Sequence, residues 1–332
     1  MFSSAAILGT GSFGTALARL TGERLPAVEM IGRSRDVADA IGAQHRNPRY
    51  LTDIELPASV TASTDPARAA AHPLVLFCVP TSATRETARE LARLGLPRET
   101  VLLSCAKGIE RGTGDRMSVI LGEVFPDNPV AVLSGPNHAE EIARDLATCA
   151  VIGCRDETLA CRLQELFTAA HFRSYTSDDI AGIELGGAIK NVYAIAAGIA
   201  AGLGLGDNAV AALVTRALAE MTRLGVKLGG RIETFAGLSG VGDLIATCFS
   251  PHSRNNRVGL ALGHGQSLQE AVDALGMVAE GVPNTLSIHE AARSAGVRTP
   301  IVDAVHGILY EDKPAARALH ELLNRDPRPE AD

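Results

Sequence analysis

The feature that most constrains this chain is a glycine-rich turn close to its N-terminus. Gly9, Gly11 and Gly14 form the pattern G-x-G-x-x-G, directly after the apolar run 5–8 and before a helix-like stretch at 15–24. Between a strand and a helix, these glycines allow a tight turn, close approach of the backbone to a pyrophosphate, and close packing of the helix on the strand. The context predicts a dinucleotide bound at the N-terminus of that helix, with an ordinary glycine-rich turn as the alternative.

Further short apolar runs follow the glycine turn through the first half of the chain. They are rich in Val, Ile and Leu and lie at 28–31, 74–79, 101–105, 130–133 and 149–152. Helix-like stretches such as 82–94 separate most of them. Continuous apolar strands that alternate with helices indicate a parallel sheet covered by helices on both faces.

The pattern changes near residue 176, where strand-like runs stop and helical patterns dominate. Long helices are predicted at 178–203 and 209–228, and shorter ones follow. A chain of 332 residues is also long enough for two domains. We therefore predict an α/β chain, with a Rossmann-type parallel-sheet domain at 1–176 that binds a dinucleotide and an all-α, substrate-binding domain at 177–332.

Composition excludes several classes of partner. The formal net charge of −7 gives no overall attraction to nucleic acid. No positive segment precedes the first apolar run, so we expect no signal peptide and a cytoplasmic protein. The longest uncharged apolar run, 192–206, is rich in Ala and Gly and is shorter than a membrane span. It predicts a buried helix and no membrane insertion.

The cysteines and histidines show no spacing typical of a metal site. The six cysteines contain no C-x-x-C pair and the nine histidines no H-x-x-x-H pair. Reduced thiols and the absence of a bound metal are the expectation, with disulfides or a metal site as the alternative.

The choice of dinucleotide is indicated at the end of the second predicted strand. An acidic residue that binds the ribose is expected there, about 20 residues after the glycine turn. Arg33 and Arg35 occupy this stretch instead, and the first carboxylate is Asp36. Guanidinium groups suit the 2′-phosphate of NADP, and the alternative is that both arginines are solvated surface residues.

Lys190 is the only charged residue between Leu185 and Gly206. A buried lysine has a lowered pKa, which suits it to proton transfer. Its helical neighbours Gly186, Gly187 and Ala194 are small, so we expect room for a ligand on its face of the helix. The alternative is a lysine whose ammonium reaches the domain surface.

Two polar segments of the second half are candidates for the same site. Asp243 follows two glycines at a predicted helix start, where it would either neutralise Lys190 or cap the helix. Ser253, Arg254 and Asn255 belong to the polar cluster 250–257, which also precedes a helical run, and such groups form a phosphate site. A solvated loop is the alternative for 253–255.

Two further polar segments follow predicted strands of the first half. Lys107 comes directly after one strand, and the segment 134–140 ends the next. Ligands of doubly wound sheets bind outside the carboxyl ends of the strands. These side chains are therefore expected to face the cofactor or the substrate.

Together these segments resemble the bacterial NAD(P)-dependent glycerol-3-phosphate dehydrogenases. The matching stretches occur in the same order along nearly the whole chain, at 9–14, 104–110, 134–140, 187–192, 237–243, 253–255 and 278–282. The resemblance implies the reversible reduction of dihydroxyacetone phosphate to sn-glycerol 3-phosphate with NADP or NAD, which supplies glycerophospholipid synthesis.

The resemblance also implies roles for individual residues. Lys190 would be the catalytic proton donor and acceptor. The substrate, a triose phosphate, would be bound by Lys107, Gly135, Asn137, Lys190, Asp243, Ser253, Arg254 and Asn255. Besides the glycines of the turn, the cofactor site would include Ser12, Phe13, Arg33, Ser34 or Arg35 in its place, Tyr50, Lys107, Ala139, Arg254, Val278 and Glu280. Phe13 stands where members of the family often have Trp or Tyr.

Two other functions fit parts of this pattern. A dehydrogenase of the same two-domain plan would act on a hydroxy acid or a hydroxyacyl thioester, but the segment 253–255 favours a phosphate-bearing substrate. A redox-sensing protein would hold the dinucleotide without turnover, but Lys190 with Asp243 favours an enzyme. The oligomeric state stays open, with a homodimer as one expectation.

Overall fold

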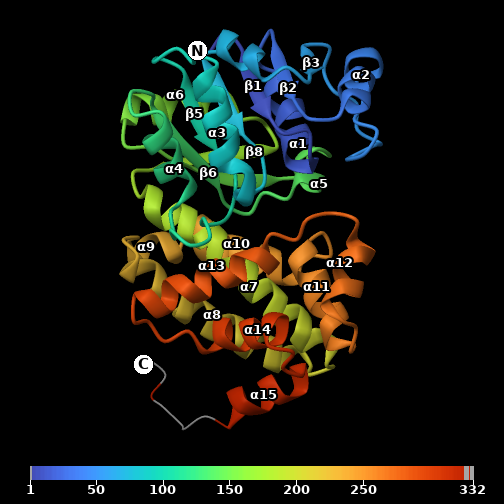
Figure 1. Cartoon of the computed structure of the whole chain (residues 1–332), viewed down its shortest axis with the longest axis vertical. Coiled ribbons are helices and arrows are strands. Elements are labelled where there is room, and N and C mark those ends of the chain that lie inside the picture. The colour runs from blue at the N-terminus through green and yellow to red at the C-terminus, as the bar shows by residue number, and fades with distance from the viewer. Residues whose placement is uncertain (1, 325–328, 330–332) are drawn as a thin grey trace.

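The computed structural model of the chain describes residues 2–324 and 329. The other positions, Met1 and part of the end of the predicted second domain, lie outside the described residues. A sheet flanked by helices forms one half of the molecule, and helices alone form the other (Figure 1). The predicted fold class, a Rossmann-type sheet followed by an all-α region, is confirmed.

The sheet has eight strands in the order β3-β2-β1-β4-β5-β6-β7-β8. All neighbouring pairs are parallel, as predicted, except β6 and β7, which are antiparallel. The strands are β1 (Ala5–Leu8), β2 (Val28–Ile31), β3 (Val60–Ser63), β4 (Leu74–Phe77), β5 (Val101–Ser104), β6 (Val130–Ser134), β7 (Thr148–Gly153) and β8 (Phe172–Ser177).

Both faces of the sheet are buried, as the apolar strands predicted. In β1, Ala5 and Ile7 belong to the core on one face, and Ala6 and Leu8 to the core on the other. The first face is covered by α1 (Ser12–Gly22), α2 (Arg35–Gln44), α5 (Ala139–Ile142) and α6 (Glu157–Phe167). The second is covered by η1 (Pro66–Ala71), α3 (Thr84–Arg93) and α4 (Met117–Val124), with the short η2 (Thr81–Ala83) before α3.

The two edge strands, β3 and β8, have no counterpart among the predicted apolar runs. Their sequences, Val-Thr-Ala-Ser and Phe-Arg-Ser-Tyr-Thr-Ser, mix polar and apolar residues. An edge strand has one neighbour only and keeps part of its surface in water, so it needs no continuous apolar run.

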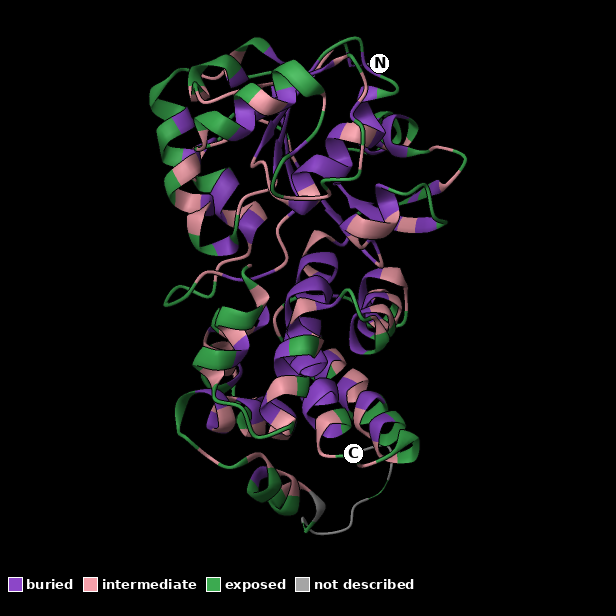
Figure 2. Cartoon of the chain, turned by 90° about the vertical axis from the view of Figure 1, so that its right-hand side faces the viewer, coloured by how far each residue is buried: buried purple, intermediate pink, exposed green. Residues whose placement is uncertain are grey.

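The helical half is built around α7 (Ile180–Gly202). Every residue from 182 to 200 is buried, and the buried segments gather at the middle of this half (Figure 2). The surrounding elements are α8 (Asp207–Lys227), α9 (Ile232–Phe235), the π-helical turn η3 (Leu238–Gly242), α10 (Asp243–Phe249), α11 (Arg254–Gly263), α12 (Leu268–Leu275), α13 (Gly281–Ser294), α14 (Pro300–Tyr310) and α15 (Ala315–Leu323).

Helices α7 and α11 cross in backbone contact. A Cβ atom added to Gly198 would lie 2.1 Å from the carbonyl oxygen of Asn256, and one added to Gly259 would lie 2.0 Å from that of Ile195. Only glycine allows such an approach. This packing fixes the N-terminus of α11, with Arg254, relative to α7, which carries Lys190.

By length and composition alone, two helical segments among the described residues are apolar enough to cross a membrane. The apolar part of Ile180–Gly202 is 89% buried within the protein, so this segment is the core helix that the sequence predicted. The other, Ile232–Phe249, is 39% buried and consists of three short elements, α9, η3 and α10.

The last strand ends at Ser177 and α7 begins at Ile180. The division into two domains at residue 176 stays a prediction.

Candidate active site

The glycine turn lies between β1 and α1. Strand β1 is the point where the order of the strands reverses: β2 and β3 lie on one side of it, and β4 and the later strands lie on the other. Gly9 has a φ of 113°, and a Cβ atom there would lie 2.5 Å from the carbonyl oxygen of Cys78. A Cβ atom on Gly14 would lie 2.1 Å from the carbonyl oxygen of Gly9, whereas one on Gly11 would meet no heavy atom within 4 Å. The open side at Gly11 and the start of α1 fit a dinucleotide pyrophosphate.

Asn47 braces this turn, and the sequence did not single it out. Its fully buried side-chain amide donates to the carbonyl oxygen of Thr10 at 2.9 Å and to Oγ1 of Thr15 at 2.8 Å. Its Oδ1 accepts from the backbone N–H groups of Arg49 at 3.0 Å and Tyr50 at 3.1 Å. Asn47 therefore ties Tyr50, a predicted cofactor residue, to the glycine turn.

The end of β2 presses against the same turn. A Cβ atom on Gly32 would lie 2.5 Å from Cγ2 of Thr10. Arg33 follows as an exposed residue, Ser34 is the N-cap of α2, and Arg35 is 80% exposed with its Nε 3.5 Å from Oδ1 of Asp39. Two exposed guanidinium groups thus lie at the position where the ribose of a bound dinucleotide is expected.

Two lysines from different elements share one buried carboxylate. Nζ of Lys190, on α7, lies 2.5 Å from Oδ1 of Asp243, and Nζ of Lys107, after β5, lies 2.9 Å from Oδ2. Lys190 is 4% exposed and Asp243 1% exposed, so Lys190 does not reach the surface. Asp243 is the first residue of α10 and Gly242 is its N-cap, so Asp243 pairs with the lysines and does not cap the helix. The cluster keeps one net positive charge.

Lys107 uses all three protons of its ammonium group within the protein. They are donated to the carbonyl oxygen of Gly135 at 2.8 Å, to Oδ1 of Asn137 at 2.7 Å and to Asp243. The side-chain Nδ2 of Asn137 is buried and has no hydrogen-bond partner, which leaves it as a donor at this centre. Predicted substrate residues from β5, β6 and α10 are therefore brought together.

Lys190 differs from Lys107 in its hydrogen bonds. It donates to Asp243 and, at 2.5 Å, to Oγ1 of Thr247, which in turn donates to the carbonyl oxygen of Asp243 at 2.6 Å. Among the described residues, the third ammonium proton of Lys190 has no acceptor. Thr247 was not predicted; it lies one helical turn after Asp243 on α10.

The surroundings of Lys190 favour its release of a proton. Burial lowers the pKa of Lys190 to about 8; Asp243 opposes this decrease and the positive charge of Lys107 adds to it. Burial alone would raise the pKa of Asp243, but the two ammonium groups hold it below its ordinary value. Burial also lowers the pKa of nearby His138, and both lysines lower it further. Burial raises the pKa of the adjacent Cys248 thiol to about 12.

The small residues beside Lys190 serve a different purpose from the one predicted. A Cβ atom on Gly186 would lie 2.3 Å from the carbonyl oxygen of Ser239, and one on Gly187 would lie 2.6 Å from Oγ of Ser134. Protein atoms thus occupy the space that was expected to hold a ligand. These glycines let η3 and β6 approach α7 and so bring Asp243 and Lys107 to Lys190.

The segment 253–255 begins a helix, as predicted. Ser253 is the N-cap of α11, with its Oγ accepting from the backbone N–H of Asn256 at 3.2 Å. Arg254 donates from Nη1 to the carbonyl oxygen of Val278 at 2.9 Å. Among the described residues, the hydroxyl proton of Ser253 and the other donors of Arg254 have no protein acceptor. They lie at a helix N-terminus, which attracts anions.

Asn255 is engaged at both ends of its amide. Its Nδ2 donates to Oδ1 of Asn191 at 2.9 Å, and its Oδ1 accepts from the backbone N–H of Gly281 at 2.9 Å. Asn191 donates to the carbonyl oxygen of Lys107 at 3.1 Å, and Asn284 donates to the same oxygen at 2.8 Å. Asn191 and Asn284, neither of them predicted, therefore connect the helical half to Lys107.

The remaining predicted cofactor residues occupy two places. Ser12 and Phe13 begin α1, and Ala139 begins α5, on the sheet half. Glu280 lies in the helical half, and its Oε1 accepts from the backbone N–H of Thr81, the first residue of η2, at 3.3 Å. Among the described residues, no hydrogen bond joins Arg33, Ser34 or Tyr50 to the lysine centre.

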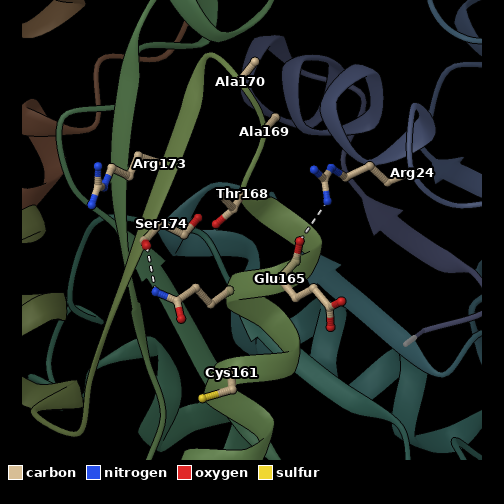
Figure 3. A pocket seen from close by; sticks show the side chains of 9 residues that line it. Arg24, Cys161, Glu165, Thr168, Ala169, Ala170, Arg173 and Ser174 are labelled. Atoms are coloured by element: carbon tan, nitrogen blue, oxygen red, sulfur yellow. Dashed lines mark hydrogen bonds between the residues drawn. The ribbon is translucent and has the colours of Figure 1, made fainter.

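Two other features of the described residues lie outside this site. A surface hollow of about 710 Å³ is lined by residues of α6, of β8 and of the loop between them, together with Arg24 (Figure 3). It contains none of the predicted site residues. No group of three His, Cys, Asp or Glu side chains in the described part of the chain could hold a metal ion.

Two family models, sequence relatives and a solved structure identify one family. Its N-terminal model, described as NAD-dependent glycerol-3-phosphate dehydrogenase N-terminus, matches residues 4–160, and the corresponding C-terminal model matches residues 179–320. A glycerol-3-phosphate dehydrogenase (NAD(P)+) of Moorella thermoacetica is 46% identical over 98% of this chain and 97% of its own length. One from Streptomyces avermitilis is 45% identical over 98% of each. The crystal structure of a glycerol-3-phosphate dehydrogenase from Coxiella burnetii has a TM-score of 0.94 at 37% identity, over 97% of this chain and 99% of that one.

Proposed function

This chain belongs to the NAD-dependent glycerol-3-phosphate dehydrogenase family, and from that premise we propose that Lys190 is the proton donor in its reaction. The chain is an NAD(P)-dependent oxidoreductase that reversibly reduces dihydroxyacetone phosphate to sn-glycerol 3-phosphate. The resemblance predicted from its motifs is confirmed, and the hydroxy-acid dehydrogenase and the redox sensor are set aside.

The observation that supports Lys190 as the proton donor is that the ammonium groups of Lys107 and Lys190 differ in their hydrogen bonds. Reduction of a ketone places negative charge on its oxygen, which a nearby cation stabilises and an acid must protonate. All three protons of Lys107 are bound within the protein, whereas one proton on Nζ of Lys190 is not. With a pKa of about 8, Lys190 is mostly protonated at neutral pH and still able to give up a proton.

The neighbours of Lys190 hold it for this step. Asp243 and Thr247 fix two of its protons and so direct the third. Lys107 supplies positive charge beside the developing alkoxide, and the unpaired Nδ2 of Asn137 supplies a further donor. Ser253 and Arg254 bind the substrate phosphate, which positions the reacting carbon.

The residues of the glycine turn fit the dinucleotide, whose nicotinamide supplies the hydride when bound. Gly9, Gly11 and Gly14 hold the pyrophosphate, and Arg33 and Arg35 hold the 2′-phosphate of NADP. From the helical half, Glu280 accepts a hydrogen bond from Thr81 of the sheet half, and Arg254 and Val278, which are hydrogen-bonded to each other, are further predicted cofactor residues. A bound dinucleotide would therefore contact both halves of the molecule.

The pH dependence of turnover tests Lys190 as the acid. Because reduction of the ketone needs the protonated form, kcat for reduction should fall as pH rises through about 8. Oxidation of sn-glycerol 3-phosphate needs the neutral amine and should show the opposite slope. Initial rates in both directions at saturating substrates check this. Between pH 6 and about 9.5, Lys190 changes from mostly protonated to mostly neutral. A kcat that does not change with pH over this range, in either direction of the reaction, would exclude Lys190 as the proton donor.

Replacing both Arg33 and Arg35 by glutamine should raise the KM for NADPH and leave the KM for NADH nearly unchanged. A charge-assisted hydrogen bond contributes roughly 1.5–3 kcal/mol, so the increase should be about 10-fold or more. Arg98→Gln is a matched control, because Arg98 is 79% exposed and lies 3.5 Å from Asp127, much as Arg35 lies from Asp39. An equal change in the KM values for NADPH and NADH would mean that these arginines do not bind the 2′-phosphate.

The cellular setting follows from the same proposal. The substrate is a small triose phosphate, and the chain acts in the cytoplasm without membrane insertion. The product feeds glycerophospholipid synthesis, whose backbone is glycerol 3-phosphate. A homodimer is compatible with this function, since the described site is formed within one chain.

A further inference from the structure

Glu184 is a buried carboxylate on α7 that the mechanism above does not use. The residue is 5% exposed, and its carboxylate accepts three hydrogen bonds. They come from the backbone N–H of Ser118 at 2.8 Å, from Oγ of Ser118 at 2.5 Å and from Nη1 of Arg116 at 2.6 Å. The donors belong to the sheet half and the acceptor to the helical half, so Glu184 joins the two.

The segment that Glu184 holds is continuous with Lys107. After Lys107 the chain forms a small hairpin, in which Ile109 pairs with Arg116 and the backbone N–H of Glu110 donates to the carbonyl oxygen of Asp115 at 2.8 Å. Helix α4 begins directly afterwards, at Met117. Glu184 thus binds the end of a short, internally paired segment, 107–118, whose beginning carries the lysine of the site.

Helix α7 also binds the other end of this segment. Asn191 donates to the carbonyl oxygen of Lys107 at 3.1 Å. Glu184 and Asn191 are two helical turns apart and so lie on the same side of α7. Lys190 is the neighbour of Asn191 on the same rigid helix. The segment 107–118 is therefore attached to α7 at two points, one on each side of the paired hairpin.

We infer that Glu184 is a positioning residue for the reaction: it fixes the segment 107–118 against α7 and so sets the place of Lys107 relative to Asp243 and Lys190. The inference deepens the proposed function and rests on it for its catalytic meaning. Without Glu184, the segment keeps its attachments through Asn191 and Asn284. It also keeps the hydrogen bonds that Arg85 of α3 makes to Glu110 in the hairpin. It loses its second point of attachment to α7, the helix that carries Lys190.

This role has a consequence that is separate from stability. Lys107 lies close enough to lower the pKa of Lys190, although burial is the larger cause. The other titratable groups that face Lys190 are Asp243, Cys248 and His138. If Lys107 moves away from Asp243, the carboxylate of Asp243 pairs with Lys190 alone, and the electrostatic repulsion between the two ammonium groups decreases. The pKa of Lys190 should then rise toward its ordinary value.

Lysine titration can be followed directly, because the chain contains only four lysines, at positions 107, 190, 227 and 313. The ε-carbon signals of ¹³C-lysine-labelled protein are assigned with Lys107→Arg and Lys190→Arg, and each is titrated by NMR. In Glu184→Ala, the pKa of Lys190 should rise by at least about 0.5. Its kcat, measured per folded enzyme, should fall about 10-fold, because small displacements at a reacting centre are costly.

A second buried carboxylate provides the matched control. Glu220 on α8 is 1% exposed and accepts from the backbone N–H groups of Ile301 at 3.1 Å and Val302 at 3.0 Å. Glu220→Ala should lower the melting temperature and leave the titration of Lys190 unchanged. If Glu184→Ala folds poorly, Ser118→Ala removes one of the same hydrogen bonds from the other side and should give a smaller rise in the pKa.

The outcomes separate this inference from the proposed function. A loss of melting temperature in Glu184→Ala with an unchanged Lys190 titration would show that Glu184 only stabilises the fold, and it would overturn the inference. An unmodified protein that does not reduce dihydroxyacetone phosphate would contradict the proposed function instead. The lysine titration would still decide the role of Glu184, because it needs no turnover.

Discussion

Replacement of Lys190 by alanine should lower kcat for reduction of dihydroxyacetone phosphate by about 10²-fold or more, the usual scale for loss of a general acid. The physical reason is that Lys190 carries the one ammonium proton at this centre that no described protein group accepts. The dissociation constant for NADPH should change little, because no hydrogen bond among the described residues joins the glycine turn to Lys190. Steady-state kinetics and NADPH binding by fluorescence measure the two quantities.

Two variants control this experiment. Lys190→Arg keeps a positive charge beside Asp243, but a guanidinium hardly releases a proton near neutral pH, so activity should stay low. Lys227→Ala removes an exposed lysine from the end of α8 and should keep normal turnover. Near-normal kcat in a folded Lys190→Ala protein would exclude Lys190 from the chemical step.

Replacement of Arg254 by alanine should decrease kcat/KM for dihydroxyacetone phosphate by about 10- to 100-fold or more. A hydrogen bond to a charged group contributes roughly 1.5–3 kcal/mol, and Arg254 lies at the N-terminus of α11, where an anion is favoured. The penalty should become much smaller with unphosphorylated dihydroxyacetone, which has no phosphate to lose.

The control for Arg254 is the next arginine of the same helix. Arg257 is exposed, one turn further along α11, so Arg257→Ala should have little effect on either substrate. Because Arg254 donates to Val278, a predicted cofactor residue, both variants are compared at saturating NADPH and NADPH affinity is measured separately. An equal loss on both substrates would show that Arg254 does not anchor the phosphate.

The parts of the fold that the sequence predicted are those in which local pattern and tertiary packing agree. The apolar runs of the inner strands are buried on both faces, and the predominantly apolar helix α7 lies at the centre of its half. The edge strands β3 and β8 carry no such pattern. The antiparallel direction of β7 is set by the path of the chain between strands, which a run of apolar residues does not encode.

The site was predictable where a motif carries its own chemistry and hidden where partners come from distant segments. The glycine turn, Lys190 and Ser253 stand out locally. Asn47, Thr247 and Glu184 are ordinary polar residues until folding buries them beside their partners. One signal was present but unused: lysine is rare in this chain, and two of its four lysines meet at Asp243.

The measurement that tests the central claim most directly is NADPH oxidation by the purified protein with dihydroxyacetone phosphate, beside NADH and beside unphosphorylated dihydroxyacetone. The account predicts rapid oxidation with the phosphorylated ketone and at least equal use of NADPH. It also predicts a kcat/KM for the unphosphorylated ketone that is lower by about 10- to 100-fold or more, the contribution expected from the phosphate contacts. Equal rates with both ketones, or no oxidation with dihydroxyacetone phosphate, would contradict it.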